Sequence, residues 1–400
     1  MRIGVLTFYY PPDLSAGSFR AGALIGALRE LAPAGSHIDV ITTMPNRYQS
    51  WSGSSASVAQ AMESLPDVTV RRIPLPTHRS DMRGQARAFL TFARAARGMI
   101  DAAEYDVIFA TSSRLMTAAL GAWAARRKRV PLYLDIRDIF VDTIGDLLPG
   151  PLALLARPPL GWLERWTMNS ARRINLVSRG FEEYFRTRYP HASLAWYTNG
   201  VDDEFVAAAP TATRPLATGG IAEILYAGNL GEGQGLHHVL PGLAQALRGR
   251  ARFVVIGDGG RRVALEQALA AAAVDNVELR APVARDRLLE AYRHADVLFL
   301  HLGAHAAFEK VLPSKLFEYA ALGKPILAGV AGFAARFVRE EIGNAALFAP
   351  CDVAGATRAF ESLQMQEAPR AEFVARHARS RLARALAGDV LDTAREPEPA

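Results

Sequence analysis

One stretch, residues 307–330, holds side chains that are suited to binding a phosphate and a sugar. Ser314, Lys315 and Glu318 lie close together in its segment PSKLFEY. The free backbone N–H groups at the start of a helix and the charge of Lys315 both attract a phosphate. We expect Ser314 to cap this helix, because a serine side chain accepts hydrogen bonds from those N–H groups. A carboxylate one turn further on, at Glu318, can bind the two neighbouring hydroxyls of a ribose. The stretch therefore predicts a nucleotide-sugar site.

The few lysines of the chain also point to this stretch. The sequence has only four lysines, and Lys310, Lys315 and Lys324 all lie within it. A lysine supplies a compact, flexible charge that suits a phosphate. Chance clustering is the alternative. We expect Lys310 to assist Lys315 at the phosphate.

Glycines follow two expected strands in the second half of the chain. The segment GNLGEGQG begins at Gly228, directly after an apolar run, and Gly257 follows the next run in VVIGDGG. Glycine lets the backbone approach an anion closely. We therefore assign Gly228, Asn229, Gln234 and Gly257 to the same nucleotide site.

Two segments of the first half place polar side chains after expected strands. Gly17, Ser18 and Arg20 follow the strand of residues 2–8, at the start of a helix. LYLDIRD is an apolar strand that ends in Asp135, Arg137 and Asp138. Ligands bind at the carboxyl ends of strands in open α/β sheets. A structural salt bridge between Arg137 and an aspartate is an equal alternative.

The expected elements form two domains, because apolar strands alternate with helices twice along the chain. Half of the 400 residues are apolar, which is enough for two cores. We predict a first Rossmann-like domain over 1–205, a linker over 206–220 that is rich in small residues, and a second Rossmann-like domain over 221–370. Residues 371–400 should form a helix that crosses back to the first domain, followed by a disordered tail.

Composition limits the class of protein. The only cysteine excludes a disulfide framework and a cysteine-based zinc site, which fits a reducing cytoplasm. No window is long and apolar enough to span a membrane, and no signal peptide is evident. The net charge is +6, but the sequence has no segment in which aromatic and basic residues alternate as in nucleic-acid-binding proteins. The positive charge therefore indicates an anionic substrate or an anionic membrane as the binding partner.

Two segments suggest peripheral contact with an anionic membrane. Residues 83–104 form a helix with a basic stripe of Arg83, Arg87, Arg94 and Arg97. Residues 147–166 are apolar, are broken by prolines and carry Trp162 and Trp166. The stripe is either a solvated helix face or a lipid contact, and the tryptophans either pack into the protein or lie at a membrane interface.

The PSK-x-FEY segment resembles the donor-site signature of the family 4 glycosyltransferases of GT-B fold, in particular bacterial surface-polysaccharide and O-antigen members. The NGVD segment of residues 199–202 recurs in that family too. The resemblance implies an α/β fold of two Rossmann-like domains facing across a cleft. In the family, one glutamate orients the donor sugar and a second binds the ribose. Glu318 matches the second, and Glu309 is the candidate for the first, nine positions earlier instead of the family's eight.

The resemblance also implies an activity and further roles. The enzyme is expected to transfer a sugar with retention of configuration from a nucleotide sugar, expected to be UDP-linked, to a saccharide acceptor, expected to be lipid-linked at the inner membrane face. Family members carry an arginine and a lysine in the glycine-rich loop, where this chain has the neutral Asn229 and Gln234. The phosphate clamp is therefore assigned mainly to Lys315, with Lys310 or Arg262 assisting.

The family places its acceptor in the first domain. Gly17, Ser18, Arg20 and Arg137 then line the acceptor side. Asp138 is the candidate to receive the proton of the acceptor hydroxyl or to bind a sugar hydroxyl.

Other chemistries find little support in the sequence. The histidines show no H-E-x-x-H or clustered metal spacing, and a D-x-D motif is absent, so we expect no metal and no cofactor besides the nucleotide sugar. Hydrolase and kinase motifs are absent as well. Two alternatives remain open. One is a UDP-sugar epimerase of the same architecture, and the other is a non-catalytic nucleotide-binding subunit.

Overall fold

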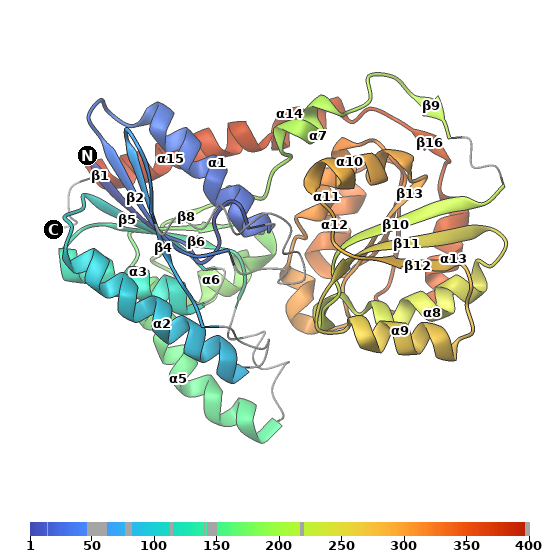
Figure 1. Cartoon of the computed structure of the whole chain (residues 1–400), viewed down its shortest axis with the longest axis horizontal. Helices are drawn as coiled ribbons and strands as arrows, with labels where there is room; N and C mark the ends of the chain where they lie inside the picture. Colours follow the sequence, from blue (N-terminus) through green and yellow to red (C-terminus); the bar gives the residue numbers. More distant parts are fainter. Residues whose placement is uncertain are drawn as a thin grey trace. The chain divides into compact units, whose positions relative to one another are not determined.

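A computed structural model describes residues 1–13, 15–45, 62–76, 82–112, 115–139, 141, 150–216 and 220–396. These residues form two compact units (Figure 1). Unit 1 contains Met1–Asn199 together with the chain from Arg379 onward, and unit 2 contains Gly200–Ala378. The chain therefore leaves unit 1 once and returns to it once.

Unit 1 is built on an eight-stranded sheet with the order β3-β4-β2-β1-β5-β6-β7-β8. The β3 strand pairs antiparallel with β4, and the remaining neighbours are parallel. The strands are β1 (Arg2–Leu6), β2 (His37–Thr43), β3 (Met62–Leu65), β4 (Val68–Ile73), β5 (Val107–Thr111), β6 (Leu132–Ile136), β7 (Arg173–Leu176) and β8 (Leu194–Ala195). The main helices are α1 (Ala16–Leu31), α2 (Met82–Asp101), α3 (Leu115–Lys128), α5 (Gly150–Asn169), α6 (Glu182–Arg188) and α15 (Arg379–Arg395).

The central strands of unit 1 are buried along their whole length. Every residue of β5 and β6 is buried, which is why these strands are apolar runs without a polar alternation. The helix α1 starts after Ser15, whose Oγ accepts a hydrogen bond from the N–H of Ser18 (3.2 Å). This cap sets the start of α1 at the carboxyl end of β1.

The last helix, α15, belongs to the core of unit 1. It packs against α1, and its Leu386 and Val390 are fully or almost fully buried. Asp389 accepts hydrogen bonds from the hydroxyl of Tyr133 on β6 (2.7 Å) and from the guanidinium of Arg173 on β7. The helix expected from residue 371 onward is divided at Ala378, where α14 (Ala371–His377) ends in unit 2 and α15 begins in unit 1.

Unit 2 is built on a six-stranded parallel sheet with the order β12-β11-β10-β13-β14-β15. Its strands are β10 (Ala222–Asn229), β11 (Ala251–Asp258), β12 (Val277–Arg280), β13 (Val297–His301), β14 (Ile326–Gly329) and β15 (Ala345–Phe348). Its helical elements are α7 (Asp203–Ala207), η3 (Glu232–Gln234), α8 (Leu236–Ala246), α9 (Arg262–Ala271), α10 (Arg285–His294), η4 (Ala306–Lys310), α11 (Lys315–Ala321), α12 (Gly332–Glu341) and α13 (Val353–Ser362). A small antiparallel pair joins β9 (Arg214–Pro215) to β16 (Gln366–Glu367).

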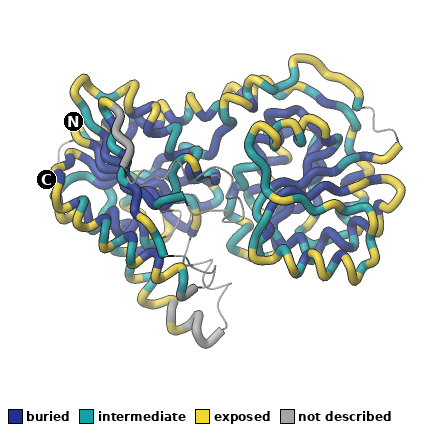
Figure 2. The backbone as a smooth tube through the Cα atoms, viewed as in Figure 1, coloured by how far each residue is buried: buried dark blue, intermediate teal, exposed yellow. Residues whose placement is uncertain are grey.

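Helices cover both faces of the unit 2 sheet. One apolar cluster includes residues of α10, α11, α12 and α14, and a second includes residues of α8, α9 and α13. The buried strands between them are drawn in dark blue in Figure 2. The prediction of two α/β domains built on parallel sheets is confirmed.

Candidate functional site

Three side chains of unit 2 form what we call the Lys315 cluster: Tyr292, Lys315 and Glu318. The ammonium of Lys315 lies 3.9 Å from a carboxylate oxygen of Glu318, one helical turn away on α11. The Tyr292 hydroxyl lies 3.3 Å from each of the two. Glu318 is only 8% exposed, whereas the Lys315 side chain is 25% exposed. The cluster thus has a lysine that solvent can reach and a carboxylate held behind it.

Burial shapes the electrostatics of the Lys315 cluster. It lowers the pKa of Lys315, an effect that the charge of Glu318 opposes. It also raises the pKa of Tyr292 well above the usual value, so this hydroxyl stays protonated. A desolvated ammonium gains from an anion beside it, because an opposite charge restores stabilisation that water would otherwise supply.

Two glycines shape the backbone beside Lys315. A Cβ added at Gly228 would lie 2.7 Å from Cε of Lys315, so a side chain there would displace the lysine stem from the end of β10. A Cβ at Gly257 would lie 1.9 Å from the carbonyl oxygen of Gly228. Both residues stand at the carboxyl ends of neighbouring strands, as the sequence predicts. Lys315 therefore lies beside Gly228, and Gly228 lies beside Gly257.

The glycine loop, residues 228–235, is held by its own polar side chains. The amide of Asn229 donates to Oε1 of Gln234 (2.8 Å), which also accepts from the backbone N–H of Gly231. The two neutral residues at the positions of the family's cations thus bind each other. In this arrangement they shape the loop and add no charge to it.

His301 fixes the glycine loop by hydrogen bonds to residues far away in the sequence. Its Nδ1 donates to the backbone carbonyl of Gln234 (2.6 Å), and its Nε2 accepts from the N–H of Cys351 (2.9 Å). Because a carbonyl only accepts and an N–H only donates, these partners set one neutral tautomer. Burial lowers the pKa of His301 to about 4, so the ring stays neutral at physiological pH.

The start of α11 differs from the expected serine cap. Ser314 occupies the N-cap position, but its side chain makes no capping hydrogen bond. Its φ of −61° and ψ of −30° are helical, whereas a capping serine has an extended backbone. The prediction of a side-chain cap at Ser314 is therefore wrong. Lys315 begins the helix, as expected.

Three further predicted residues lie on other elements of unit 2. Glu309 is exposed on η4, and its backbone packs against Gly332, where a Cβ would meet the Glu309 carbonyl at 2.2 Å. Lys310 is half-buried at the end of η4. Arg262 donates to the carbonyl oxygens of Gly257 (2.7 Å) and Arg280 (3.3 Å). Arg262 thus joins two strand ends.

In unit 1, Gly17 and Arg137 come together at the carboxyl end of the sheet. A Cβ at Gly17 would lie 3.1 Å from Nη1 of Arg137, whose backbone N–H donates to Ser112 (3.0 Å) after β5. Burial lowers the pKa of Arg137 to about 10, so it remains a cation at neutral pH. Asp138 keeps an exposed side chain, yet partial desolvation raises its pKa to about 6 against the pull of Arg137.

Arg20 and Ser18 lie deeper than Arg137. The Arg20 guanidinium makes a bidentate ion pair with Asp135 (2.8 Å for both bonds) and donates to the carbonyls of Tyr197 and Thr198. Burial opposes ionisation of Asp135, but Arg20 lowers its pKa overall. The hydroxyl of Ser18 is fully buried, and no partner for it is found among the described residues. Arg20 therefore joins α1 to β6 and to the chain after β8.

Three side chains that can serve as metal ligands also come together, although the sequence motifs predict no metal. Glu232, His237 and His238 of unit 2 place one ligand atom each within 4.8 Å of the others. These residues lie on η3 and on the first turn of α8. The spacing of the histidines along the chain gives no sign of this grouping, because the carboxylate comes from the loop before the helix.

Comparison with known proteins gives two family matches. Residues 26–195 match a model described as "Glycosyl transferase 4-like domain", and residues 216–380 match one described as "Glycosyl transferases group 1". No curated protein matches the chain.

Solved structures resemble the whole chain at low identity. A sucrose-phosphate synthase from Thermosynechococcus elongatus is 15% identical, with 99% of this chain and 94% of that chain covered and a TM-score of 0.66. An Escherichia coli trehalose-6-phosphate protein bound to UDP-2-fluoro glucose is 13% identical, with both chains fully covered and a TM-score of 0.68. Anabaena HepE in complex with UDP is 16% identical, with 99% and 98% covered and a TM-score of 0.59.

At these identities the structural likeness establishes the fold, while the two family models establish the family. They match consecutive parts of the chain, the first within unit 1 and the second in unit 2 except for its last two residues. The chain belongs to the GT-B glycosyltransferases of the family 4 type.

Proposed function

We propose that the protein transfers a sugar from a UDP-sugar to a saccharide acceptor, with retention of configuration and without a catalytic metal. The observation that carries this proposal is the Lys315 cluster beside Gly228. A cation, a hydroxyl and a buried carboxylate lie within 4 Å of one another, and the cation's stem lies against Gly228 at the end of β10. This is the set of groups that a nucleoside diphosphate needs.

Each group has a role in the proposed reaction. Lys315 binds the diphosphate and stabilises the charge that develops on it as the glycosidic bond breaks. Glu318 accepts hydrogen bonds from the ribose hydroxyls. Glu309, which is exposed on η4, orients the donor sugar, and Lys310 assists at the phosphate. In unit 1, Asp138 receives the acceptor proton, and Arg137 binds an acceptor oxygen.

The donor site is tested by calorimetric titration with UDP, GDP, ADP and CMP, with and without magnesium. We expect UDP to bind in EDTA. Glu318→Ala should weaken binding by about 1.5–3 kcal/mol, or roughly 10- to 150-fold, because it removes a charged hydrogen-bond acceptor. Lys315→Met keeps the side-chain stem and removes the charge. It should therefore weaken the binding of UDP more than the binding of uridine.

The matched control for Glu318→Ala is Glu290→Ala. Glu290 lies on α10 of the same unit, but its contact with Arg287 is on the surface. It should leave the UDP affinity unchanged. If Glu318→Ala binds UDP as tightly as the wild type, the assigned site is wrong.

A non-catalytic binding subunit remains the second candidate, because Asn229 and Gln234 bind each other and supply no charge. Incubation with UDP-sugars separates the possibilities. Sugar transfer to a saccharide acceptor with the donor's anomeric configuration, read by NMR, supports the proposal. Formation of an isomeric UDP-sugar without acceptor identifies an epimerase. Nucleotide binding with neither product identifies a binding subunit.

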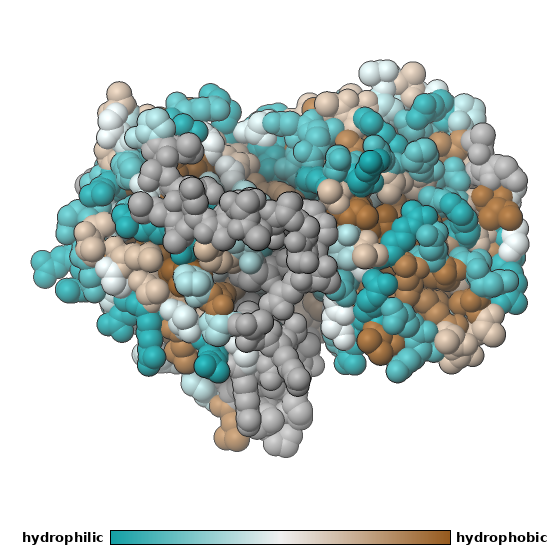
Figure 3. Space-filling view, in the orientation of Figure 1, coloured by the Kyte–Doolittle hydropathy of each residue, from teal (hydrophilic) through white to brown (hydrophobic). Residues whose placement is uncertain are grey.

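We propose further that the acceptor is a lipid-linked saccharide of a surface polysaccharide such as O-antigen, and that unit 1 contacts an anionic membrane from the cytoplasmic side. The helices α2 and α5 both pack on α3. Leu90 on α2 is 57% exposed, and Leu155 and Trp162 on α5 are 75% and 68% exposed. Figure 3 shows a small brown, hydrophobic area at the lower edge of the view. In the described part of the chain, no helix is long and apolar enough to cross a membrane.

The basic stripe supports the same contact. Arg87 and Arg94 are exposed on α2, and Arg97 stacks over the ring of Trp123 at 4.8 Å. The Arg83 side chain lies outside the described residues. Trp166 is half-buried beside Arg126, so Trp162 is the more exposed of the two tryptophans.

Sedimentation with anionic vesicles tests the membrane contact. We expect binding at low salt that weakens at high salt, since each arginine near an anionic surface contributes about 1 kcal/mol. Trp162→Ala should reduce binding, whereas Trp196→Ala should not, because the ring of Trp196 lies under Arg179 and Arg186 instead of under an arginine of the basic stripe. Equal sedimentation with neutral and anionic vesicles contradicts the proposal.

A further inference from the structure

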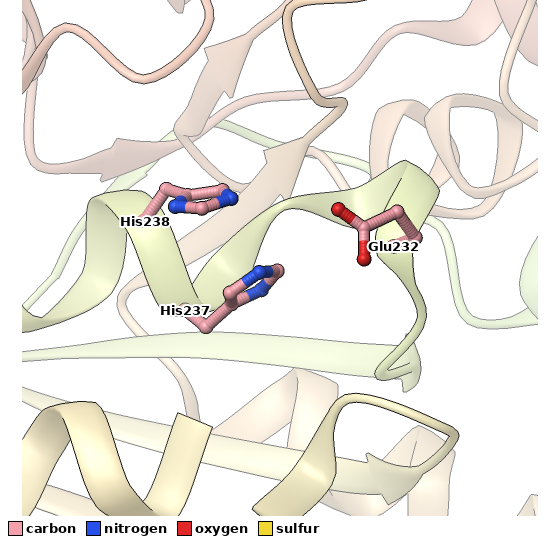
Figure 4. A group of neighbouring side chains, drawn as sticks. All are labelled: Glu232, His237 and His238. Carbon is pink, nitrogen blue, oxygen red and sulfur yellow. The ribbon is translucent and has the colours of Figure 1, made fainter. Parts of the chain in front are cut away.

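The His–Glu group, which we define as Glu232, His237 and His238, is arranged like a metal site. Figure 4 shows both imidazoles and the carboxylate turned toward a common space. The two rings lie with their centroids 3.9 Å apart, and one ligand atom from each residue falls within 4.8 Å of the others. Gly235 makes this possible, because its φ of +58° turns the chain from η3 into α8 and brings Glu232 opposite the helix start.

We propose that the His–Glu group binds a divalent first-row transition-metal ion, with Zn²⁺ the best fit, and that the ion fastens the glycine loop to α8. Two imidazoles and one carboxylate suit Zn²⁺, Co²⁺ and Ni²⁺, whereas Mg²⁺ and Ca²⁺ prefer oxygen ligands alone. The ligand atoms now lie up to 4.8 Å from one another. Zinc sits about 2.1 Å from each ligand, so the three ligand atoms need to move closer to one another by roughly 1 Å. Water or a further ligand completes the coordination.

The surroundings allow an ion to enter. His238 is exposed, and Glu232 and His237 are half-buried, so the site opens to solvent without unfolding. Arg261 is the competitor, because its guanidinium forms an ion pair with one carboxylate oxygen of Glu232. The ion therefore binds against a nearby positive charge. Removal of that charge is expected to tighten binding.

The consequence for the protein concerns the glycine loop. His301 already fixes this loop through the carbonyl of Gln234. A metal bridge from Glu232 to His237 and His238 spans Gly235, the hinge between η3 and α8. The ion thus restrains the loop at a second point. This role is independent of the reaction proposed above.

The first experiment is a metal titration of tag-free, EDTA-treated full-length protein. We expect one Co²⁺ per chain, seen as visible d–d absorption, and its displacement by Zn²⁺. His237→Ala, His238→Ala and Glu232→Gln should each weaken Zn²⁺ binding by at least about tenfold. Substitution of a residue that only hydrogen-bonds to a metal ligand already lowers metal affinity by about that factor. The control is His294→Ala, an exposed histidine at the end of α10 in the same unit. It should leave the affinity unchanged.

Arg261→Ala provides a test of opposite sign, with Zn²⁺ affinity expected to rise by about tenfold as the competing charge is removed. Hydrogen exchange over residues 229–238 should slow when Zn²⁺ is added. The proposed site is overturned if Zn²⁺ does not bind or binds without a fixed stoichiometry. It is also overturned if His294→Ala weakens Zn²⁺ binding as much as His237→Ala does. If Zn²⁺ binds stoichiometrically but hydrogen exchange over residues 229–238 does not slow, the ion does not restrain the glycine loop. Neither readout requires nucleotide or acceptor, so failure of the transferase proposal leaves this test intact.

Discussion

Acidification is expected to destabilise unit 2 through one side chain, His301. Its ring is 1% exposed and is held neutral by the carbonyl of Gln234 and the N–H of Cys351. Burial is the main cause that lowers its pKa from 6.5 to about 4, and His238 lowers it further. Protonation places a proton on Nε2, where the Cys351 N–H already points. The charged ring is therefore incompatible with the native contacts.

The direction and size of the effect follow from the two pKa values. Between pH 6.5 and about 4, the unfolded chain binds a proton that the folded chain does not. The stabilisation is therefore complete above pH 6.5 and is lost as the pH falls through this range. A change from pH 7.5 to 5.0 should lower the free energy of unfolding by about 2 kcal/mol through this group. The glycine loop should loosen in the same range, because its carbonyl partner is disturbed.

The assay compares the wild type with His301→Gln. Glutamine can both donate and accept a hydrogen bond but does not titrate. Between pH 7.5 and 5.0, the unfolding free energy of His301→Gln should therefore fall by about 2 kcal/mol less than that of the wild type. Urea unfolding is followed by far-UV circular dichroism at both pH values. Tryptophan fluorescence separates the units, because all five tryptophans precede residue 197 and so belong to unit 1.

Two further measurements complete the test. His294→Gln, at an exposed histidine of α10, should keep the wild-type pH dependence. NMR of ring-labelled histidine gives the pKa of His301 directly. A value near 6.5, or an equal pH dependence in wild type and His301→Gln, would refute the reasoning.

Three other substitutions test contacts on which the sites rest. Gly257→Ala should destabilise unit 2 by about 1–3 kcal/mol and weaken UDP binding, because the new Cβ falls 1.9 Å from a carbonyl oxygen; Gly260→Ala, with nothing within 4 Å of its Cβ, is the control in calorimetric melting. Asp389→Asn should destabilise unit 1 by about 3 kcal/mol, because it removes the charge from a partly buried ion pair with β7; Asp392→Asn, whose side chain is 71% exposed, should change the tryptophan-monitored unfolding little. Arg20→Lys should cost about 2–4 kcal/mol in the same assay, since lysine cannot reproduce the bidentate pair, and a loss within 0.5 kcal/mol would show that the pair is dispensable.

Local patterns predicted much of the fold. The alternating apolar runs indicate two parallel-sheet domains, because buried strands need apolar residues on both faces. Lys315 and Glu318 are three residues apart, so a helix places them on one face, as the 3.9 Å contact shows. Gly228 and Gly257 stand at the carboxyl ends of β10 and β11, as expected from the apolar runs that precede them.

Contacts between distant residues were beyond such reasoning. His301 binds residues 67 and 50 positions away, and Arg20 pairs with Asp135 across 115 positions. The antiparallel edge strand β3 and the break at Ala378 also carry no clear local signal, because they depend on neighbouring elements. The serine at 314 resembles a cap by type, but the backbone there is already helical.

The Lys315 cluster explains how a neutral glycine loop and a nucleotide site can coexist. Asn229 and Gln234 cannot neutralise a diphosphate, so the charge must come from elsewhere on the same surface. In the proposed site, Lys315 supplies this charge from α11, because its stem lies beside Gly228 at the strand end that carries the loop. Without a ligand, the ammonium of Lys315 lies 3.9 Å from the carboxylate of Glu318, which is longer than a hydrogen bond. A diphosphate at Lys315 and ribose hydroxyls at Glu318 would give both groups closer partners, so the donor would complete the site in place of a second protein cation.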